Sequence, residues 1–79
     1  MFINKTADGK NNLCGEKVAA LRTQIGISQR ALADRLQIAG LDIDKNAIQR
    51  IEAGKRFVTD IELKVLSQVL EISVEKLLD

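Results

Sequence analysis

Four polar side chains near the middle of the chain carry the hydrogen-bonding groups that read the edges of DNA bases. They are Lys45, Asn46, Gln49 and Arg50. Lys and Arg donate to O6 and N7 of guanine, whereas Asn and Gln pair with N6 and N7 of adenine. The same residue types also occur on helix faces that only meet solvent. Their types therefore leave two interpretations open, a surface that reads DNA and an ordinary wet surface.

A helix over residues 45–53 would bring these four side chains together. At 100° per residue they share one face, with the small Ala53 at its end. The apolar residues fall on the opposite face: Ala47, Ile48 and Ile51. Asp44 can cap the start of this helix and Gly54 can end it. The pattern predicts one face for the core and one face for a partner or for solvent.

Helix formers dominate the rest of the sequence. Pro is absent and aromatic residues make up 3% of the chain, so the segments typical of strands are missing. Apolar spacing near 3.6 residues predicts four more helices. They cover residues 13–25, 29–38 and about 60–70, with a short one after Ser73. Ser28 can cap the second helix, Thr59 and Glu62 form a capping box for the fourth, and Ile61 is expected on the apolar face of the fourth. The expected fold class is all-α.

Length and composition exclude several classes of function. A chain of 79 residues forms one small domain with little room for an enclosed pocket. With no His and a single Cys, it has no set of zinc ligands, no Ser-His-Asp or Cys-His constellation and no internal disulfide. We therefore expect no enzyme, metal site, cofactor or small-molecule ligand. Cys14 is either a thiol activated near a helix N-terminus or a small, half-buried hydrophobe.

Charge and hydropathy bear on location and partners. The formal net charge is +1, with 12 Lys and Arg against 11 Asp and Glu, so attraction to DNA depends on where the charges lie. No apolar run reaches the length of a membrane span or of a signal peptide. We expect a cytoplasmic protein with no membrane partner. Residues 1–12 are polar and turn-forming, which predicts a flexible or loosely docked arm before a domain over residues 13–79.

The order of the motifs resembles the helix-turn-helix of the Cro/C1-type family, the phage-repressor-like (XRE) DNA-binding domains. The matching segments are Leu21-Arg22, Gly26-Ile27-Ser28-Gln29, Ala31 to Leu36, and Ile48 to Arg56. The segment from Leu66 to Leu78 is also similar to the last two helices of the family. The resemblance covers about residues 13–79. It implies a compact five-helix, lambda-repressor-like fold in which the helix over residues 45–53 is the recognition helix.

The resemblance also implies a DNA-reading role for individual residues of this helix. Lys45, Asn46 and Arg50 occupy the positions that read bases in the family. Gln49 is added because the helical wheel places it on the same face. Double-stranded DNA is therefore the expected partner.

Residues outside the reading face receive supporting roles from the same resemblance. Gln29 is expected to contact a phosphate and to brace the first recognition residue, and Lys55 and Arg56 are expected to hold backbone phosphates. On local grounds alone two alternatives stay open: Lys55 and Arg56 as a solvated surface pair, and Gln29 as a plain first-turn residue. Glu52 faces the negative end of the helix dipole, and in similar proteins such a Glu pairs with an Arg of the first helix. The resemblance thus implies an ion pair between Arg22 and Glu52.

One segment departs from the family pattern. The family passes through a tight turn before its recognition helix, whereas this chain inserts extra residues within 37–43. Leu41 and Ile43 are expected to tuck into the core and to keep the recognition helix docked. This extended turn bears on the angle at which the helix would enter a groove of DNA.

Two functions compete on these grounds. The first is a sequence-specific transcriptional regulator, expected to be a repressor that places its recognition helix in the major groove of a two-fold operator. It would act as a homodimer, formed either through Val74, Leu77 or Leu78 of the last helices or only on DNA. The alternative is a protein-interaction module of the same fold, such as an antitoxin or an antagonist of another regulator. Near-neutral net charge favours the alternative, and the basic segment from Lys45 to Arg56 favours the regulator.

Overall fold

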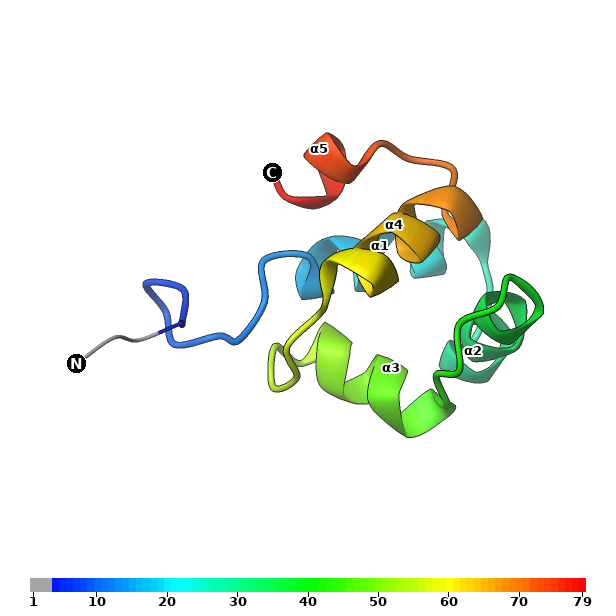
Figure 1. Cartoon of the computed structure of the whole chain (residues 1–79), viewed down its shortest axis with the longest axis horizontal. Helices are drawn as coiled ribbons and strands as arrows, with labels where there is room; N and C mark the ends of the chain where they lie inside the picture. The colour runs from blue at the N-terminus through cyan, green and yellow to red at the C-terminus, as the bar shows by residue number, and fades with distance from the viewer. Residues whose placement is uncertain (1–3) are drawn as a thin grey trace.

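Five helices account for the secondary structure of residues 4–79, the part of the chain that the computed structural model describes. They are α1 (Gly15–Ile25), α2 (Gln29–Ile38), α3 (Lys45–Glu52), α4 (Asp60–Val69) and α5 (Val74–Leu77). These residues contain no strand. In Figure 1, α3 lies along the lower edge of the molecule, where it packs against α1 and α2. The expected all-α, five-helix fold is confirmed.

Polar side chains start four of these helices. The side chains of Ser28, Asp44, Thr59 and Ser73 each accept a hydrogen bond from the backbone N–H three residues further on. Glu62 completes a capping box because its carboxylate accepts from the backbone N–H of Thr59 at 3.0 Å. Each of these bonds satisfies a backbone donor that a helix leaves free at its first turn. The predicted caps of α2, α3 and α4 are therefore confirmed, and Ser73 caps α5 in the same way.

Two helices are shorter than expected, and the buried face of α4 includes fewer residues than the sequence predicts. The first helix begins at Gly15 instead of residue 13, because the Asn12 side chain accepts from the Gly15 N–H and sets the start there. The third ends at Glu52, with Ala53 as its C-cap. Ile61 is 69% exposed, so the expectation that it belongs to the buried face of α4 is wrong. It stands in the first turn of α4, whereas Leu66 lies in the core and Leu63, Val65 and Val69 pack against it.

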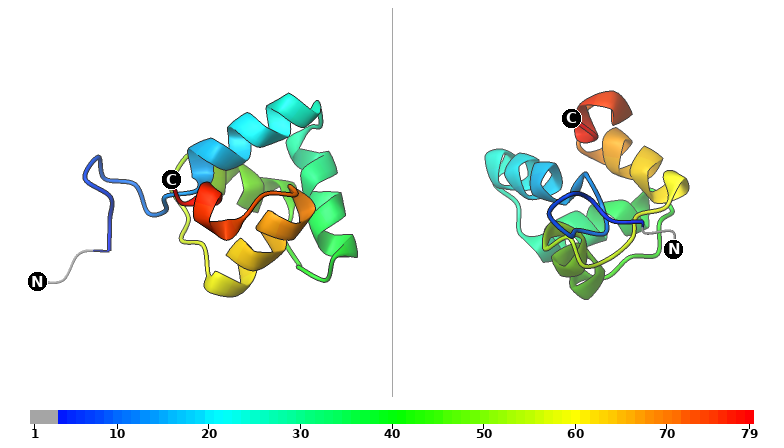
Figure 2. Two further views of the ribbon diagram at one scale, coloured as in Figure 1. Left: turned by 90° about the horizontal axis from the view of Figure 1, so that it is seen from above. Right: turned by 90° about the vertical axis from the view of Figure 1, so that its left-hand side faces the viewer.

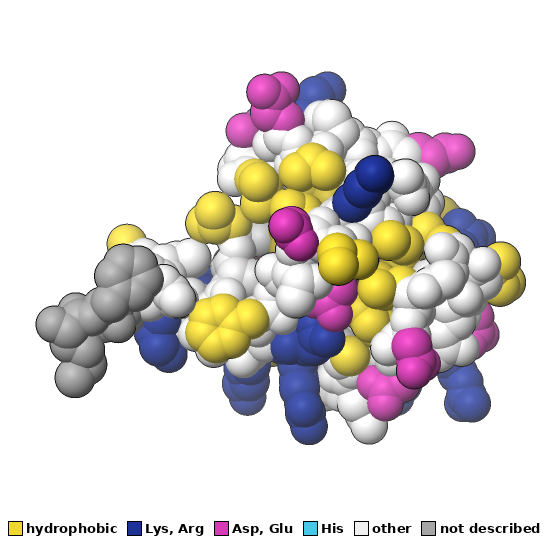
Figure 3. Space-filling model, in the orientation of Figure 1, with side chains coloured by type: hydrophobic (Ala, Val, Ile, Leu, Met, Phe, Trp, Pro, Cys, Tyr) yellow, Lys and Arg dark blue, Asp and Glu magenta, His cyan; other side chains and the backbone are white. Residues whose placement is uncertain are grey.

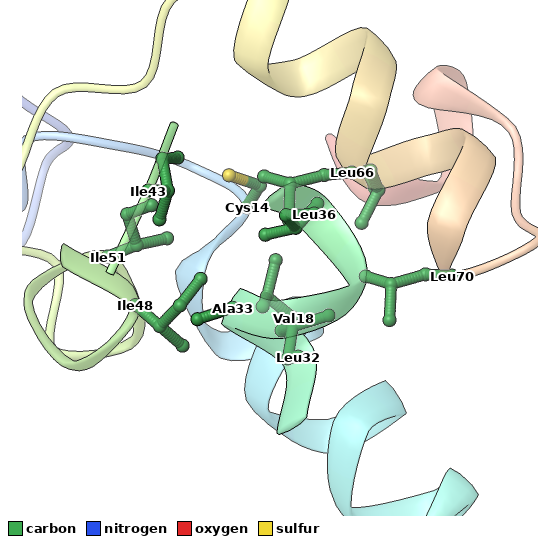
Figure 4. Close-up of a cluster of buried hydrophobic side chains, with 11 residues drawn as sticks. Cys14, Val18, Leu32, Ala33, Leu36, Ile43, Ile48, Ile51, Leu66 and Leu70 are labelled. Atoms are coloured by element: carbon green, nitrogen blue, oxygen red, sulfur yellow. The ribbon is translucent and has the colours of Figure 1, made fainter. Parts of the chain in front are cut away.

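The core joins one face of α3 to the other helices. Ile48 and Ile51 of α3 are fully buried, as are Leu32 and Leu36 of α2. Figure 4 shows these side chains gathered with other buried residues from α1, α4 and the turn before α3. Burial of such side chains stabilises the fold by roughly 1.5–3 kcal/mol each. Because the apolar face of α3 packs in this core, the polar face of the helix points outward.

The extended turn before α3 is anchored in the core. Ile43 is only 2% exposed and Leu41 packs against the same cluster. The Gln37 amide donates to the backbone carbonyl of Ile43 at 2.9 Å. Gly40 has φ +98°, a left-handed conformation that favours glycine and lets the chain leave α2. The prediction that Leu41 and Ile43 tuck into the core is confirmed.

The chain before α1 runs outward beside the loop that follows α3 (Figure 2). Residues 6–10 form a turn in which the Thr6 N–H donates to the Lys10 carbonyl at 2.8 Å. Asn11 and Asn12 bond to the loop after α3. The expected arm is thus docked at its end, and residues 1–3 of it lie outside the described part of the chain. The division into an arm and a domain stays a prediction.

Candidate nucleic-acid interface

The outward face of α3 presents all four of the predicted base-reading side chains to solvent. Lys45, Asn46, Gln49 and Arg50 are exposed, and within residues 4–79 none of these side chains makes a hydrogen bond or ion pair with the protein. Three of them line an open hollow of about 290 Å³, together with Ala53 and Lys55. Their donors and acceptors are therefore available to a ligand that approaches this face.

Positive charge gathers on the same side of the molecule. Figure 3 shows several Lys and Arg side chains projecting along the lower edge, the edge along which α3 lies in Figure 1, with Asp and Glu side chains beside them toward the right. Side chains that project from an edge in this way can each approach a phosphate of a nucleic-acid backbone. The distribution of charge thus supplies an attraction that the net charge of +1 does not reveal.

Arg22 and Glu52 link α3 to α1. Arg22 Nε donates to Glu52 Oε2 at 2.7 Å and Nη2 donates to Oε1 at 3.1 Å. A third donor, Nη1, reaches the Ile27 carbonyl at 2.9 Å. The hydrogen bond to Glu52 raises the pKa of Arg22. The implied ion pair is present, and it offsets the unfavourable position of a carboxylate in the last turn of α3.

Gln29 joins the same group of side chains. Its amide Nε2 donates to Glu52 Oε1 at 3.0 Å. The expectation that Gln29 braces the first recognition residue is therefore wrong, because its amide holds the last turn of α3 instead of Lys45. The start of α2 therefore lies beside the last turn of α3.

Lys55 and Arg56 follow α3 and differ in what their side chains touch. Arg56 Nη1 and Nη2 donate to the two carboxylate oxygens of Glu62 at 2.9 and 2.8 Å. The hydrogen bond from Arg56 holds the pKa of Glu62 below its ordinary value, although burial opposes that shift. Lys55 is exposed, and no ion pair forms on its side chain within residues 4–79. The structure thus leaves the Lys55 ammonium free and commits the Arg56 guanidinium to α4.

Cys14 lies in the core and has no part in this surface. Its side chain is 1% exposed, and burial raises the pKa of its thiol. An activated thiol would need the opposite shift and access to solvent. Of the two interpretations of Cys14, the structure supports the small buried hydrophobe.

The three residues expected at a dimer interface differ in their exposure to solvent. Leu77 is fully buried and belongs to the core, so it cannot contact a second copy. Leu78 is 41% exposed, and Val74 is half-buried. The four-residue helix α5 packs on α4, and this contact uses the Leu77 side chain.

Two asparagines beside the interface were missed in the sequence. Asn11 and Asn12 fall in the expected arm, yet their side chains bond to the loop that carries Lys55. Asn is a common capping residue, so Asn12 ahead of the first helix offered a weak local signal. Its two long-range contacts, to the carbonyls of Ile51 and Arg56, left no signal in the sequence.

The helices described over residues 4–79 include none with both the length and the apolar character that crossing a bilayer requires.

Comparisons with known proteins agree with this geometry. A helix-turn-helix family model matches residues 18–77. Among solved structures, the chain is similar to the restriction-modification controller protein C.AhdI from Aeromonas hydrophila. The two share 28% sequence identity with a TM-score of 0.69, and the match covers 80% of this chain and 84% of that chain. A search of curated proteins found no match.

Proposed function

The chain belongs to the Cro/C1-type helix-turn-helix family of DNA-binding transcriptional regulators, and from that premise we propose that it is a repressor that reads a two-fold operator with α3. The observation that carries this proposal is the outward face of α3, whose four polar side chains are exposed and unengaged. A helix in the major groove presents such side chains to base edges. A bound repressor would deny the site to RNA polymerase by occupying it.

Base readout is assigned to four residues. Asn46 and Gln49 carry the paired donor and acceptor that suit adenine, and Lys45 and Arg50 carry the donors that suit guanine. The cap formed by Asp44 on the Ala47 N–H, at 2.8 Å, sets where α3 begins and so where Lys45 stands. Each well-made paired contact discriminates against the wrong base by about 1–3 kcal/mol.

Contacts with the phosphates of the DNA backbone are assigned to residues on either side of the outward face of α3. Lys55 would hold a phosphate beyond the end of α3. Gln29 would contribute at the start of α2, the end of the helix whose dipole favours an anion. Arg56 is given a smaller part in phosphate binding than the family implies, because Glu62 already neutralises it.

A homodimer on DNA completes the proposal. Two copies related by a two-fold axis would place two α3 helices about one helical turn apart on the operator. Ile61 on α4 and Leu78 at the end of α5 are 69% and 41% exposed, and they are the apolar residues that the last two helices offer for a contact between copies. The similarity to a restriction-modification controller supports a role in transcription control.

The test is selection of bound sequences from a random duplex pool. The wild-type chain should enrich a palindromic motif, and its half-site spacing should report the dimer. The double variant Asn46→Ala, Arg50→Ala should lose preference at defined positions of that motif. A matched control, Lys64→Ala with Gln68→Ala, changes two exposed residues of α4 and should enrich the wild-type motif.

The outcome of this selection also distinguishes the repressor from the competing function, a protein-interaction module. If the folded wild-type chain enriches nothing and shows no salt-sensitive binding to mixed-sequence duplex DNA, the repressor proposal fails. The protein-interaction module of the same fold would then account for the polar face of α3.

A further inference from the structure

Asn12 bonds simultaneously to the start of α1, the end of α3 and the loop beyond it. Its Oδ1 accepts from the Gly15 N–H at 2.8 Å. Its Nδ2 donates to the Ile51 carbonyl at 3.1 Å and to the Arg56 carbonyl at 2.8 Å. One amide thus satisfies a backbone donor of α1 and two backbone acceptors, one in α3 and one past its end.

Asn11 continues the same contact along the loop. Its backbone N–H donates to the Gly54 carbonyl at 2.8 Å, and its Nδ2 donates to the Lys55 carbonyl at 3.0 Å. The carbonyls of residues 54, 55 and 56 are therefore all bonded to this pair of asparagines. We call the pair Asn11 and Asn12 the amide clamp.

Close packing of glycines allows the clamp to form. A Cβ at Gly15 would lie 2.1 Å from the Ile51 carbonyl oxygen, so the start of α1 approaches the end of α3 as only glycine permits. Gly54 has φ +74°, and the methylenes of Lys10 lie against it, 2.8 Å from where a Cβ would stand. The two glycines thus let the start of α1 approach the end of α3 and let Lys10 approach the loop that follows it.

The loop held in this way is the one that carries Lys55. Its other attachments come from α3, through the Lys55 N–H to the Arg50 carbonyl at 2.9 Å, and from α4, through the Arg56–Glu62 pair. The clamp supplies the third attachment, from residues that precede the first helix. Residues 11 and 12 also lie before the segment that the family model matches, residues 18–77.

We propose that Asn11 and Asn12 are positioning residues for DNA binding, which fix the loop so that the Lys55 ammonium stands where a backbone phosphate lies. The inference rests on the proposed function. A loop that is already ordered loses little conformational freedom when DNA binds, so more of the contact energy of Lys55 appears as affinity. The clamp itself touches no base and no phosphate.

Asn12→Ser tests the clamp while keeping the bond to the Gly15 N–H at the start of α1. A Ser side chain accepts from the backbone N–H three residues on, as Ser28 does in this chain at 3.0 Å, so the bond to Gly15 is retained. The two donations to Ile51 and Arg56 are lost. Asn12→Ala loses all three bonds, and its difference from Asn12→Ser reports the contribution of the bond to Gly15.

Binding to the duplex enriched by the wild-type chain, or to mixed-sequence duplex DNA, is measured over a range of salt concentrations. We expect Asn12→Ser to bind about tenfold more weakly and the slope of log affinity against log salt to fall by about 0.9, the value of one phosphate contact. Lys55→Ala should lower affinity and slope in the wild-type background and have little further effect in Asn12→Ser. Asn46→Ala, at the other end of α3, should have its full effect in both backgrounds.

This pattern separates positioning from a general loss of structure. Partial unfolding would weaken binding without coupling Asn12 to Lys55. If Asn12→Ser is folded and keeps the wild-type affinity and slope, or if its effect adds fully to that of Lys55→Ala, the clamp proposal is overturned. A wild-type chain that binds no DNA would overturn the proposed function as well, which is a different result.

Asn11→Ala gives an independent measurement should Asn12→Ser fold poorly. Its buried Oδ1 has no hydrogen-bond partner within residues 4–79, so the substitution removes only the bond from Nδ2 to the Lys55 carbonyl. We expect a fold close in stability to the wild type and a weaker, less salt-dependent affinity. Unchanged binding by this variant would count against the clamp.

Discussion

Arg22 and Glu52 form a forked ion pair that joins α1 to the last turn of α3, with side chains only 18% and 9% exposed. Most surface pairs contribute less than about 1 kcal/mol because water and mobile side chains weaken them. A two-point contact in which both side chains are largely shielded should exceed that value. The pair is therefore expected to contribute to the free energy of unfolding as well as to the placement of the recognition helix.

A double-mutant cycle measures this contribution. Arg22→Ala, Glu52→Ala and the double variant should give a coupling of about 1–3 kcal/mol in urea unfolding. The pair Lys10–Glu16 is the internal control, because its side chains are 31% and 77% exposed and screening by water should make its coupling smaller than that of Arg22 and Glu52. A coupling between Arg22 and Glu52 no larger than that of the control would contradict the interpretation.

Stability should fall in acid because of Glu62. Its folded pKa is lowered, chiefly by the hydrogen bond from Arg56, so the ionised carboxylate is favoured in the folded state. The stabilisation is therefore complete above the ordinary value of 4.5 and is lost as the pH falls through the lower folded pKa. Glu62→Gln keeps an oxygen for the capping box and isolates the charge.

Urea unfolding of this variant at pH 7 and near pH 3 tests the assignment. Glu62→Gln should be less stable than the wild type by about 1–2 kcal/mol at pH 7, with a smaller difference in acid. Asp34→Asn, at an exposed position on α2, should differ from the wild type by less than about 0.5 kcal/mol at both pH values. An equal deficit of Glu62→Gln at both pH values would rule out the charge as its cause.

The extended turn before α3 should depend on Ile43. Ile43→Ala removes a side chain that is 2% exposed and should cost about 2–5 kcal/mol in the free energy of unfolding. Ile38→Ala is the matched control, because Ile38 is 88% exposed and its loss should change stability by less than about 0.5 kcal/mol. Thermal or urea unfolding compares them directly. Similar losses for the two variants would mean that the turn is not anchored by its apolar side chain.

Cys14 should be protected from thiol reagents in the folded chain. Its side chain is 1% exposed, and burial raises the pKa of the thiol. Because the pKa of the thiol is raised in the folded state, the buried thiol favours folding in its protonated form. This contribution to the free energy of unfolding is present at neutral pH and is lost as the pH rises through the folded pKa. Labelling at mildly alkaline pH should proceed only as fast as the protein opens, and should become rapid in urea. Labelling at the same rate in both conditions would place the thiol at the surface.

Local signals explain why so much of the fold could be predicted from the sequence. Ser28, Asp44 and Thr59 each act on a backbone group three residues away, so the sequence alone contains both partners. The two faces of α3 follow from periodicity in the same way. Burial of Ile48 and exposure of Arg50 agree with the prediction for that reason.

Long-range contacts explain what could not be predicted. Asn12 meets Ile51 across 39 positions of sequence, and only the packing of α1 on α3 brings them together. The Arg56 side chain points toward Glu62 because the path of the intervening loop allows this contact. The resemblance to the family implied instead that Arg56 contacts a phosphate. In α5, four residues are too few for periodicity to tell the buried Leu77 from the exposed Leu78.

In α3, the side chains that face outward and the side chains that hold the fold together belong to different residues. This arrangement has an evolutionary consequence. Within residues 4–79, the side chains of Lys45, Asn46, Gln49 and Arg50 take part in no hydrogen bond or ion pair that holds the fold together, while Glu52 and the buried isoleucines do that work. Substitutions at the four outward positions should therefore change stability by less than about 0.5 kcal/mol each. A lineage could exchange one operator sequence for another by mutating these positions while the scaffold stays intact. Operator preference is thus free to diverge faster than the fold.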